Sequence, residues 1–363
     1  MTDLLYSEAE TDLRAAVRSL LADRADPAAL AARVEDGDPC DRDLWRTLAG
    51  DMGLAGLLVP EKLGGQGASH REAAVVLEEL GRAVTPVPYL TSAVVATATL
   101  LEAGAGDLLG ELATGREVAV LAVPLATGPA TGADSGAPAA SDGTVTGVAD
   151  AAAADVLLVL RPDGLYAVEA ADATVEPLVP LDLTRPLARV TATAGGRRLA
   201  DADTARAAVR RGLLVGAGLL ASEQLGLAEW CLEETVRHLR TRHQFNRPLG
   251  SFQALKHRLA QLWLEVAGAR AAARNAADAL AGGSADAPLA VAVAQAHCSK
   301  VAVRAAEECV QLHGGIGMTW EHPAHLYLKR AKADAIALGT AGAHKDAVAA
   351  LVDLPAPAPA PAR

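Results

Sequence analysis

Aromatic residues are scarce in this chain of 363 residues. Phe, Trp and Tyr make up 3% of the sequence, and only two residues, Phe245 and Phe252, are Phe, although 51% of the sequence is hydrophobic. The core must therefore be built from Ala, Leu and Val, a composition that favours closely packed helices. Since single cores stop growing near ~250 residues, we expect two or three domains.

Basic surface, long apolar runs and cysteine pairs are missing as well. The formal charge is −11 and Lys and Arg are dispersed, which argues against nucleic acid or anionic lipid as a partner. Without 18 consecutive apolar residues, or a basic N-terminal region before an apolar run, we expect no membrane contact and a cytoplasmic location. The four cysteines form no CxxC pair, so we expect buried free thiols and neither disulfides nor a zinc site.

The spacing of apolar residues changes twice along the chain. From Leu4 to about Leu112 it is helical, with breaks at 59–67 and 85–88. Between about Glu117 and Arg198 it consists of short runs rich in Val, Leu and Thr, which predict the strands of a small β domain. These runs are 118–123, 144–148, 156–160, 165–168 and 190–193. Within them, 124–143 is rich in Ala, Gly, Pro, Ser and Thr, so we expect a mobile loop there.

A helical period returns at about Ala202 and predicts four long helices. The first has more than thirty residues, the second ends at Gly282-Gly283, and the third and fourth span about 289–312 and 324–351. Four antiparallel helices with short connections indicate a bundle. We therefore divide the chain into four parts: an N-terminal helical domain (1–115), a middle β domain (116–200), a C-terminal four-helix bundle (201–354) and a disordered or extended Pro/Ala tail (355–363).

Two segments of the bundle carry residues suited to a nucleotide cofactor. The turn that starts at Gln311 has three Gly, so its backbone can approach a phosphate, although alone it would more often be a glycine helix cap. In the segment 242–253, Arg242 offers a fork for a diphosphate, Phe245 could stack on a planar ring and Gln253 could bond a ribose or ring edge. Taken singly, Arg242 is more often a solvated helix end and Phe245 a core residue.

Together, the two segments resemble the acyl-CoA dehydrogenase family. Its pattern Arg-x-Gln-Phe-Gly-x-Pro-Leu-x-x-x-Gln matches 242–253 except at Asn246, and Gln-x-x-Gly-Gly-x-Gly-x-x-x-Glu-x-Pro matches 311–323. The segment 45–67 is similar to the family's early helical segment, so the resemblance covers nearly the whole chain. It implies a mostly α fold with a central, small β-barrel-like domain, FAD as cofactor, and introduction of a double bond next to a CoA thioester.

That reaction needs a carboxylate to take the α proton and a flavin to accept hydride from the β carbon. The two places where the family keeps its Glu fall on Leu338, followed here by Gly339-Thr340, and on Gly216. Neither side chain can accept a proton, so we expect no catalytic residue in this chain. Glu223, Glu233 and Glu234 are interpreted as ordinary exposed or interhelical charges.

The resemblance also implies two separate half-sites. In the family, the flavin-facing strands carry a Thr-Glu-Pro-like loop and, beside the ring, an aromatic or Ser/Thr turn. In this chain the residues 125–129 stand at the place of the loop, and the residues 148–151, which include no aromatic, stand at the place of the turn. We therefore expect the chain's own isoalloxazine pocket to be degraded. The other two segments reach across the dimer interface to the adenine and diphosphate end of the neighbour's FAD, whereas Thr340 touches the subunit's own flavin. The implied cofactor-binding residues are Arg242, Gln244, Phe245, Gln253, Gln311, Gly314, Gly315 and Thr340.

Similar chains are the second subunits of heteromeric acyl-CoA dehydrogenases that handle bulky substrates such as steroid side chains. We therefore expect a homologous subunit as partner in a heterotetramer and an acyl-CoA substrate, with electron-transfer flavoprotein as one candidate for the electron acceptor, which the sequence does not identify. Two alternatives stay open: a self-sufficient homo-oligomer whose base is Asp334 or a residue of the 124–143 loop, and a non-catalytic scaffold. Because family loop geometry explains His313, His322 and His325, and no carboxylate or Cys completes a set, we expect no metal.

Overall fold

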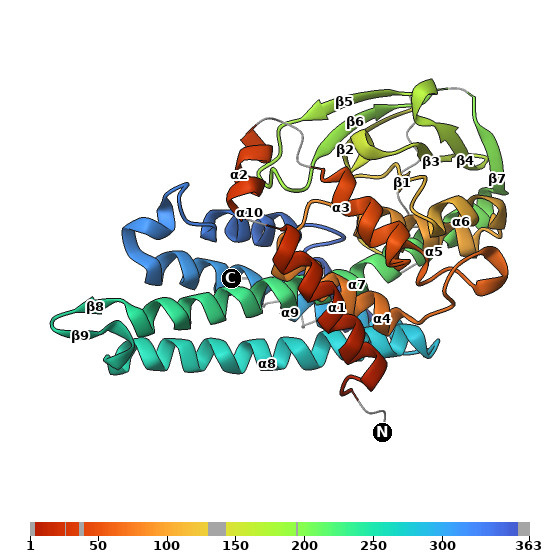
Figure 1. Cartoon of the computed structure of the whole chain (residues 1–363). Helices are drawn as coiled ribbons and strands as arrows, with labels where there is room; N and C mark the ends of the chain where they lie inside the picture. Colours follow the sequence, from red (N-terminus) through yellow and green to blue (C-terminus); the bar gives the residue numbers. More distant parts are fainter. Residues whose placement is uncertain (1–3, 26, 36–39, 130–142, 194, 355–363) are drawn as a thin grey trace, which may run out of the picture.

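Helices from both ends of the chain pack together, and two small sheets lie along one side of them (Figure 1). The computed structural model describes residues 4–25, 27–35, 40–129, 143–193 and 195–354. The predicted Pro/Ala tail and most of the predicted 124–143 loop lie outside these residues. Within them, no helix combines the length and the apolar character that a bilayer crossing requires.

The N-terminal part is helical, as predicted, and its helices begin at sequence signals. Ser7 and Ser69 each form a capping box with the Glu three residues later, which fixes the starts of α1 and α4. The α-helices of this part are α1 (Glu8–Arg24), α2 (Pro27–Glu35), α3 (Arg42–Arg46), α4 (His70–Arg82), α5 (Thr97–Glu102) and α6 (Gly106–Ala113). Two π-helical segments, Thr47–Asp51 and Tyr89–Ala96, connect them.

Two sheets make up the middle of the chain. One has the order β1-β3-β4-β7 and the other β2-β6-β5, and all pairings are antiparallel except that of β1 with β3. The strands are β1 (Ala119–Leu121), β2 (Thr144–Ala149), β3 (Val156–Arg161), β4 (Gly164–Glu169), β5 (Thr174–Leu178), β6 (Leu187–Thr191) and β7 (Arg197–Asp201). The five predicted strands are present. The pattern missed β5 and β7, because both are largely exposed and carry few apolar residues.

Three long helices form the core of the bundle: α7 (Ala202–Thr241), α8 (Gln253–Ala281) and α9 (Ala287–His313). Small residues allow the close helix packing that the composition predicts. Where α4 crosses α7, a Cβ added to Gly226 would lie 1.8 Å from the carbonyl oxygen of Glu78. Any larger residue at Gly226 would push the two helices apart. The predicted fold class is confirmed.

The prediction of one continuous fourth helix is wrong. The segment contains α10 (Ala324–Asp334) and α11 (Ala341–Leu351), separated by six residues. Leu338 and Gly339 have φ of +52° and +103°, which a right-handed helix does not contain, and the Thr340 hydroxyl caps α11 by accepting from the Ala343 amide. The apolar spacing continues through this break, which is why the sequence pattern did not show it.

The turn after α7 is a tight hairpin of β8 (His243–Gln244) and β9 (Arg247–Pro248). Its two central residues, Phe245 and Asn246, have φ of +52° and +57°, as a type I′ turn requires. Asn adopts this left-handed conformation more readily than most residues. The departure from Gly at Asn246 is therefore compatible with the turn.

Candidate functional site

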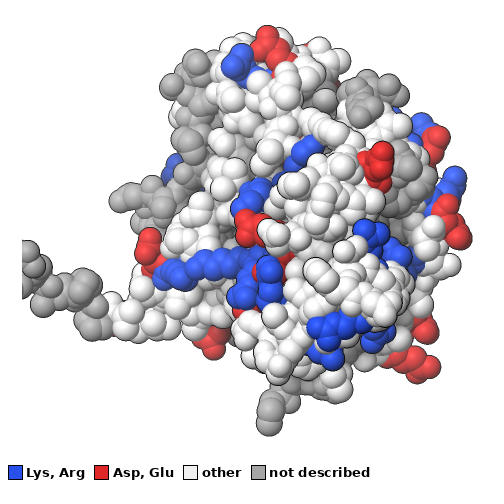
Figure 2. Space-filling model, turned by 90° about the vertical axis from the view of Figure 1, so that its left-hand side faces the viewer, with Lys and Arg blue, Asp and Glu red and all other residues white. Residues whose placement is uncertain are grey.

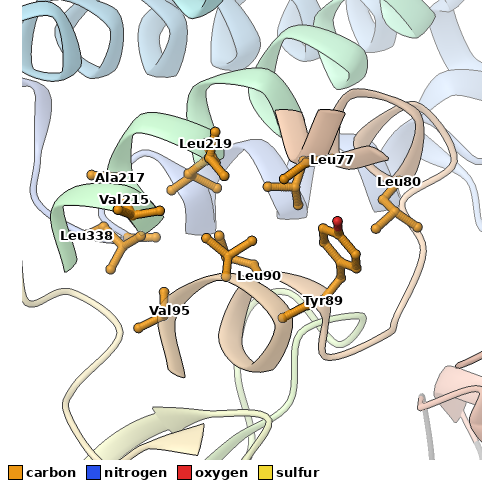
Figure 3. Close-up of a cluster of buried hydrophobic side chains, with 14 of the residues drawn as sticks. Leu77, Leu80, Tyr89, Leu90, Val95, Val215, Ala217, Leu219 and Leu338 are labelled. Atoms are coloured by element: carbon orange, nitrogen blue, oxygen red, sulfur yellow. The ribbon is translucent and has the colours of Figure 1, made fainter. Parts of the chain in front are cut away.

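The two positions at which a base would be expected lie next to each other inside the protein. A Cβ added to Gly216 of α7 would lie 3.2 Å from Leu338 Cδ1 and 2.6 Å from Val95 Cγ2. Figure 3 shows Leu338 at one end of a row of buried apolar side chains that passes Val95 and Leu90 and reaches Tyr89. Segments 122 residues apart thus converge on one point, and neither provides a proton acceptor there.

The space beside Leu338 is small and apolar. The cavity beside it measures about 30 Å³ and is lined almost entirely by aliphatic side chains, which come from the segment Tyr89–Ala96, β1 and the residues 123–125 after it, β2 and α7. That volume holds one or two water molecules, whereas binding sites for drug-sized ligands measure roughly 300 Å³ or more. In this conformation a flavin ring or an acyl chain has no room beside Leu338.

The loop that follows β1 closes this space. The Leu338 amide donates a hydrogen bond to the Leu125 carbonyl oxygen at 2.7 Å. A Cβ added to Gly128 would lie 3.2 Å from Gly339 Cα, so the two backbones are in direct contact. The loop at the position of the family's flavin-facing strands therefore packs on the Leu338 segment itself.

A cluster of buried charges joins the loop between β5 and β6 to α7 and α10. Arg330 Nε donates to Asp182 Oδ2 at 2.5 Å and Arg330 Nη1 to Glu223 Oε1 at 2.6 Å, while Arg185 also pairs with Glu223. Glu223 is only 2% exposed. The sequence suggested that Glu223 is either an exposed or an interhelical charge. The structure shows an interhelical charge, so the exposed alternative is wrong for this residue.

Asp334, the alternative base, belongs to this buried cluster. Its side chain is inaccessible to solvent, and its nearest cation is Arg185, at 3.7 Å. Burial, together with the neighbouring Glu223 carboxylate, raises the pKa of Asp334 to about 8, against the opposing effect of Arg185 and Arg330. Asp334 does not line the cavity beside Leu338. Its position therefore does not suit a base acting at that cavity.

Asp334→Asn should remove a pH dependence of stability. The folded chain keeps this proton up to about pH 8, whereas the unfolded chain releases it near pH 3.8, so the folded state binds more protons between these values. Stability attributable to Asp334 is then complete below pH 3.8 and falls as the pH rises towards 8. As the pH rises from 5 to 8.5, the free energy of unfolding of the variant, measured in urea, should increase relative to that of the wild type by at least about 1 kcal/mol. The exposed Asp346→Asn is the control, and an equal pH profile for both variants would contradict this assignment.

A second set of predicted residues gathers at one end of the bundle. Because α7 and α9 run parallel, the Arg242–Gln253 segment and the loop after His313 emerge at the same end. This end faces the viewer in Figure 2, where Lys and Arg side chains form several clusters separated by uncharged surface. Phe245 is 86% exposed. The other predicted residues exposed at this end are Arg242, Gln244, Gln253, Gln311, Gly314 and Gly315.

The polar side chains of this set are free to bind a ligand. Among the residues that the structure describes, Arg242 makes hydrogen bonds only through its backbone, accepting from the Leu249 amide and donating to the His238 carbonyl oxygen. Gln244, Gln253 and Gln311 have no side-chain hydrogen bond within the same described ranges. A guanidinium and three amides presented in this way suit an anionic, polar ligand arriving from outside the chain.

Thr340 lies far from the rest of the predicted cofactor-binding set. It caps α11, and His344, four residues further on, lines a cavity with Pro288 and Val291 of the first turns of α9. Since α9 has 27 residues and is about 40 Å long, Thr340 is near the opposite end of that helix from Gly314. The structure thus separates the predicted residues into two groups.

One feature of the bundle end was not predicted. Glu234 of α7 lies 3.6 Å from Nε2 of both His313 and His322, so a carboxylate does accompany these histidines. The prediction that no carboxylate completes the set is wrong, because Glu234 is about 80 residues away in sequence and meets them only through helix packing. The spacing of Glu234 and His238, one helical turn apart, was the available signal.

Comparison with known proteins identifies relatives over almost the full length. Residues 7–108 match the family description "Acyl-CoA dehydrogenase, N-terminal domain" and residues 205–352 match "Acyl-CoA dehydrogenase, C-terminal domain". The Acyl-CoA dehydrogenase IpdE2 of Mycobacterium tuberculosis is 39% identical over 89% of this chain and 91% of its own. A chain of the ChsE4-ChsE5 complex from the same organism superimposes with a TM-score of 0.85 at 30% identity, covering 98% of this chain and 100% of that one. A chain of a variant of the Tcur3481-Tcur3483 steroid ACAD gives 0.83 at 30% identity, covering 95% and 98%.

Proposed function

Because the chain belongs to the acyl-CoA dehydrogenase family, we propose that it is the subunit that holds one end of a partner's FAD. A homologous subunit would supply the Glu base and the pocket for the flavin ring. The pair would then carry out α,β-dehydrogenation of an acyl-CoA thioester. FAD is the cofactor of this family and, when bound, accepts the hydride from the β carbon.

The contrast between the two ends of the bundle carries this proposal. Around Leu338 the chain has no base, a cavity of about 30 Å³ and a loop hydrogen-bonded across it. At the other end, Arg242 and the glutamines are exposed and without side-chain partners among the described residues. A scaffold would gain nothing from keeping this second group accessible. A self-sufficient enzyme would need the first group open and furnished with a base.

The exposed residues suit specific parts of the cofactor. The Arg242 guanidinium can pair with two diphosphate oxygens, and the backbone of Gly314 and Gly315 can approach a phosphate because a Cβ at either position would meet no atom within 4 Å. Phe245 offers a ring face, and Gln244, Gln253 and Gln311 offer amides for the ribose and adenine. These residues bind and orient, and none of them transfers a proton.

The relatives bear on the partner and the substrate. The ChsE4-ChsE5 structure is a complex of two different subunits, and the Tcur3481-Tcur3483 protein is described as a steroid ACAD. We extend both properties to this chain as part of the proposal: a heterotetramer with a homologous subunit and a bulky, steroid-derived acyl-CoA. Electron-transfer flavoprotein would reoxidise the flavin.

Arg242→Ala tests the cofactor contact. In the complex with the partner subunit we expect FAD to bind about 10- to 100-fold more weakly, because a charge-assisted hydrogen bond contributes roughly 1.5–3 kcal/mol. Equilibrium dialysis of FAD against the deflavinated complex measures this change. Arg240→Ala, exposed on the last turn of α7 but outside the Arg242–Gln253 segment, is the matched control. Equal affinities for the two variants would refute the assigned role of Arg242.

A further inference from the structure

Four titratable side chains from three parts of the chain meet just below the exposed loops at the bundle end. Glu234 and His238 come from α7, His313 is the last residue of α9, and His322 lies in the loop before α10. The Glu234 oxygen and the two Nε2 atoms of His313 and His322 all lie within 4.8 Å of one another. The His313 ring lies between the other two imidazoles, with centroid distances of 4.2 Å to His238 and 4.3 Å to His322.

His313 is the most deeply buried side chain of this cluster. Its side chain is fully buried, and its Nε2 has no hydrogen-bond partner within the described part of the chain. Its Nδ1 donates to the Cys309 carbonyl oxygen at 2.7 Å and lies 3.7 Å from Cys309 Sγ. With the hydrogen on Nδ1, Nε2 carries a lone pair, and it lies 3.6 Å from the Glu234 oxygen. Two acceptors at this separation are unfavourable unless a proton or a metal ion lies between them.

The surroundings have the form of a metal site. Histidine ligands usually donate their second N–H to a backbone carbonyl, as His313 does, and ligating carboxylates are held by outer hydrogen bonds. Arg237 holds Glu234 in this way, with Nε at 2.9 Å and Nη2 at 2.5 Å. The separation of 3.6 Å between Glu234 and each Nε2 is close to the roughly 3.4 Å between two ligands of a tetrahedral zinc ion with bonds near 2.1 Å.

We propose that Glu234, His313 and His322 bind a divalent cation of the zinc class, with His238 beside the fourth position. Two imidazoles and one carboxylate suit Zn²⁺ and its neighbours Co²⁺ and Ni²⁺. His322 Nδ1 accepts from the Ala324 amide at 3.2 Å, so the ring hydrogen is on Nε2 in the metal-free chain, and binding an ion through Nε2 moves it to Nδ1 and breaks this hydrogen bond. The ion would join α7 to the loop after α9, and so fix the spacing between the segments that contain Arg242 and Gly314.

Metal titration of the untagged, full-length chain tests this proposal. After treatment with a chelator, the wild type should bind one Zn²⁺ with a dissociation constant of about 1 μM or tighter in calorimetry. His313→Gln and His322→Gln should each bind at least about 100-fold more weakly, beyond what the loss of an outer hydrogen bond costs. His325→Gln, in the first turn of α10 and with its ring against Trp320, should bind like the wild type.

The environment of the ion provides a second readout that does not depend on variant folding. X-ray absorption of the zinc-loaded wild type should show two imidazole nitrogens and at least one carboxylate oxygen. No binding by the wild type, equal binding by the two His variants and the wild type, or an ion surrounded only by water oxygens would each overturn the proposal.

Discussion

Arg330→Met is expected to lower the free energy of unfolding by about 3–5 kcal/mol. Arg330 is 3% exposed and donates to Asp182, Glu223 and Thr184. Without its guanidinium, Asp182 loses its cation and Glu223 keeps only Arg185, so carboxylates remain buried with too little positive charge. The methionine fills most of the volume, so the loss reports the charge rather than a cavity.

The control is Lys332→Met on the same helix. Urea unfolding of the two variants compares the stability lost with a buried ion pair with the stability lost with an exposed one. Lys332 pairs with Glu307 at 2.6 Å, but the side chains are 43% and 54% exposed. An exposed pair of this kind contributes roughly 0–1 kcal/mol. Similar losses in the two variants would contradict the description of Arg330 as the central cation of a buried cluster.

Leu338→Glu should not create an active dehydrogenase, although it places a carboxylate where the family keeps one. We expect the chain alone to show no acyl-CoA-dependent dye reduction and to lose about 3–5 kcal/mol of stability. Removing a buried leucine costs roughly 1.5–3 kcal/mol, and burying a carboxyl group without a partner adds about 1–3 kcal/mol. The cavity of about 30 Å³ has room for at most one or two water molecules beside that group and none for a substrate.

Leu338→Met is the control for this substitution. It keeps the apolar character and nearly the volume, so it should cost less than about 1.5 kcal/mol. If Leu338→Glu bound FAD without a partner and turned over a CoA thioester, the closed pocket would be a feature of the unliganded chain only. The self-sufficient enzyme would then be the better interpretation.

Local patterns in the sequence were sufficient for most of the fold. The capping serines, the helical spacing of α7 to α9 and the Val/Leu runs of β1 to β4 act within a few residues, so they appear in the sequence. The break before α11 does not. Leu338 is held in its left-handed conformation by a hydrogen bond to Leu125, more than 200 residues earlier, and no local pattern indicates such a contact.

The candidate site divides in the same way. The exposed residues around Arg242 and Gln311 belong to short motifs, and the motifs predicted them together. No motif could have predicted the cluster of buried charges. Its members Arg185, Glu223 and Arg330 come from a loop, from α7 and from α10, respectively, and meet only in the folded chain. Glu223 looked like an ordinary helical charge for the same reason. For Glu234, the spacing to His238 was the available signal, and nothing local indicated His313 or His322.

The most direct test of the proposed half-site is the flavin content of the untagged chain, purified alone and purified after co-expression with a homologous acyl-CoA dehydrogenase subunit. We predict a colourless chain alone, and a yellow complex whose FAD is lost when the two subunits are separated. The absorbance of flavin relative to protein gives the answer in both preparations. FAD bound equally well by the chain alone, or a colourless complex, would contradict a cofactor site shared between two subunits.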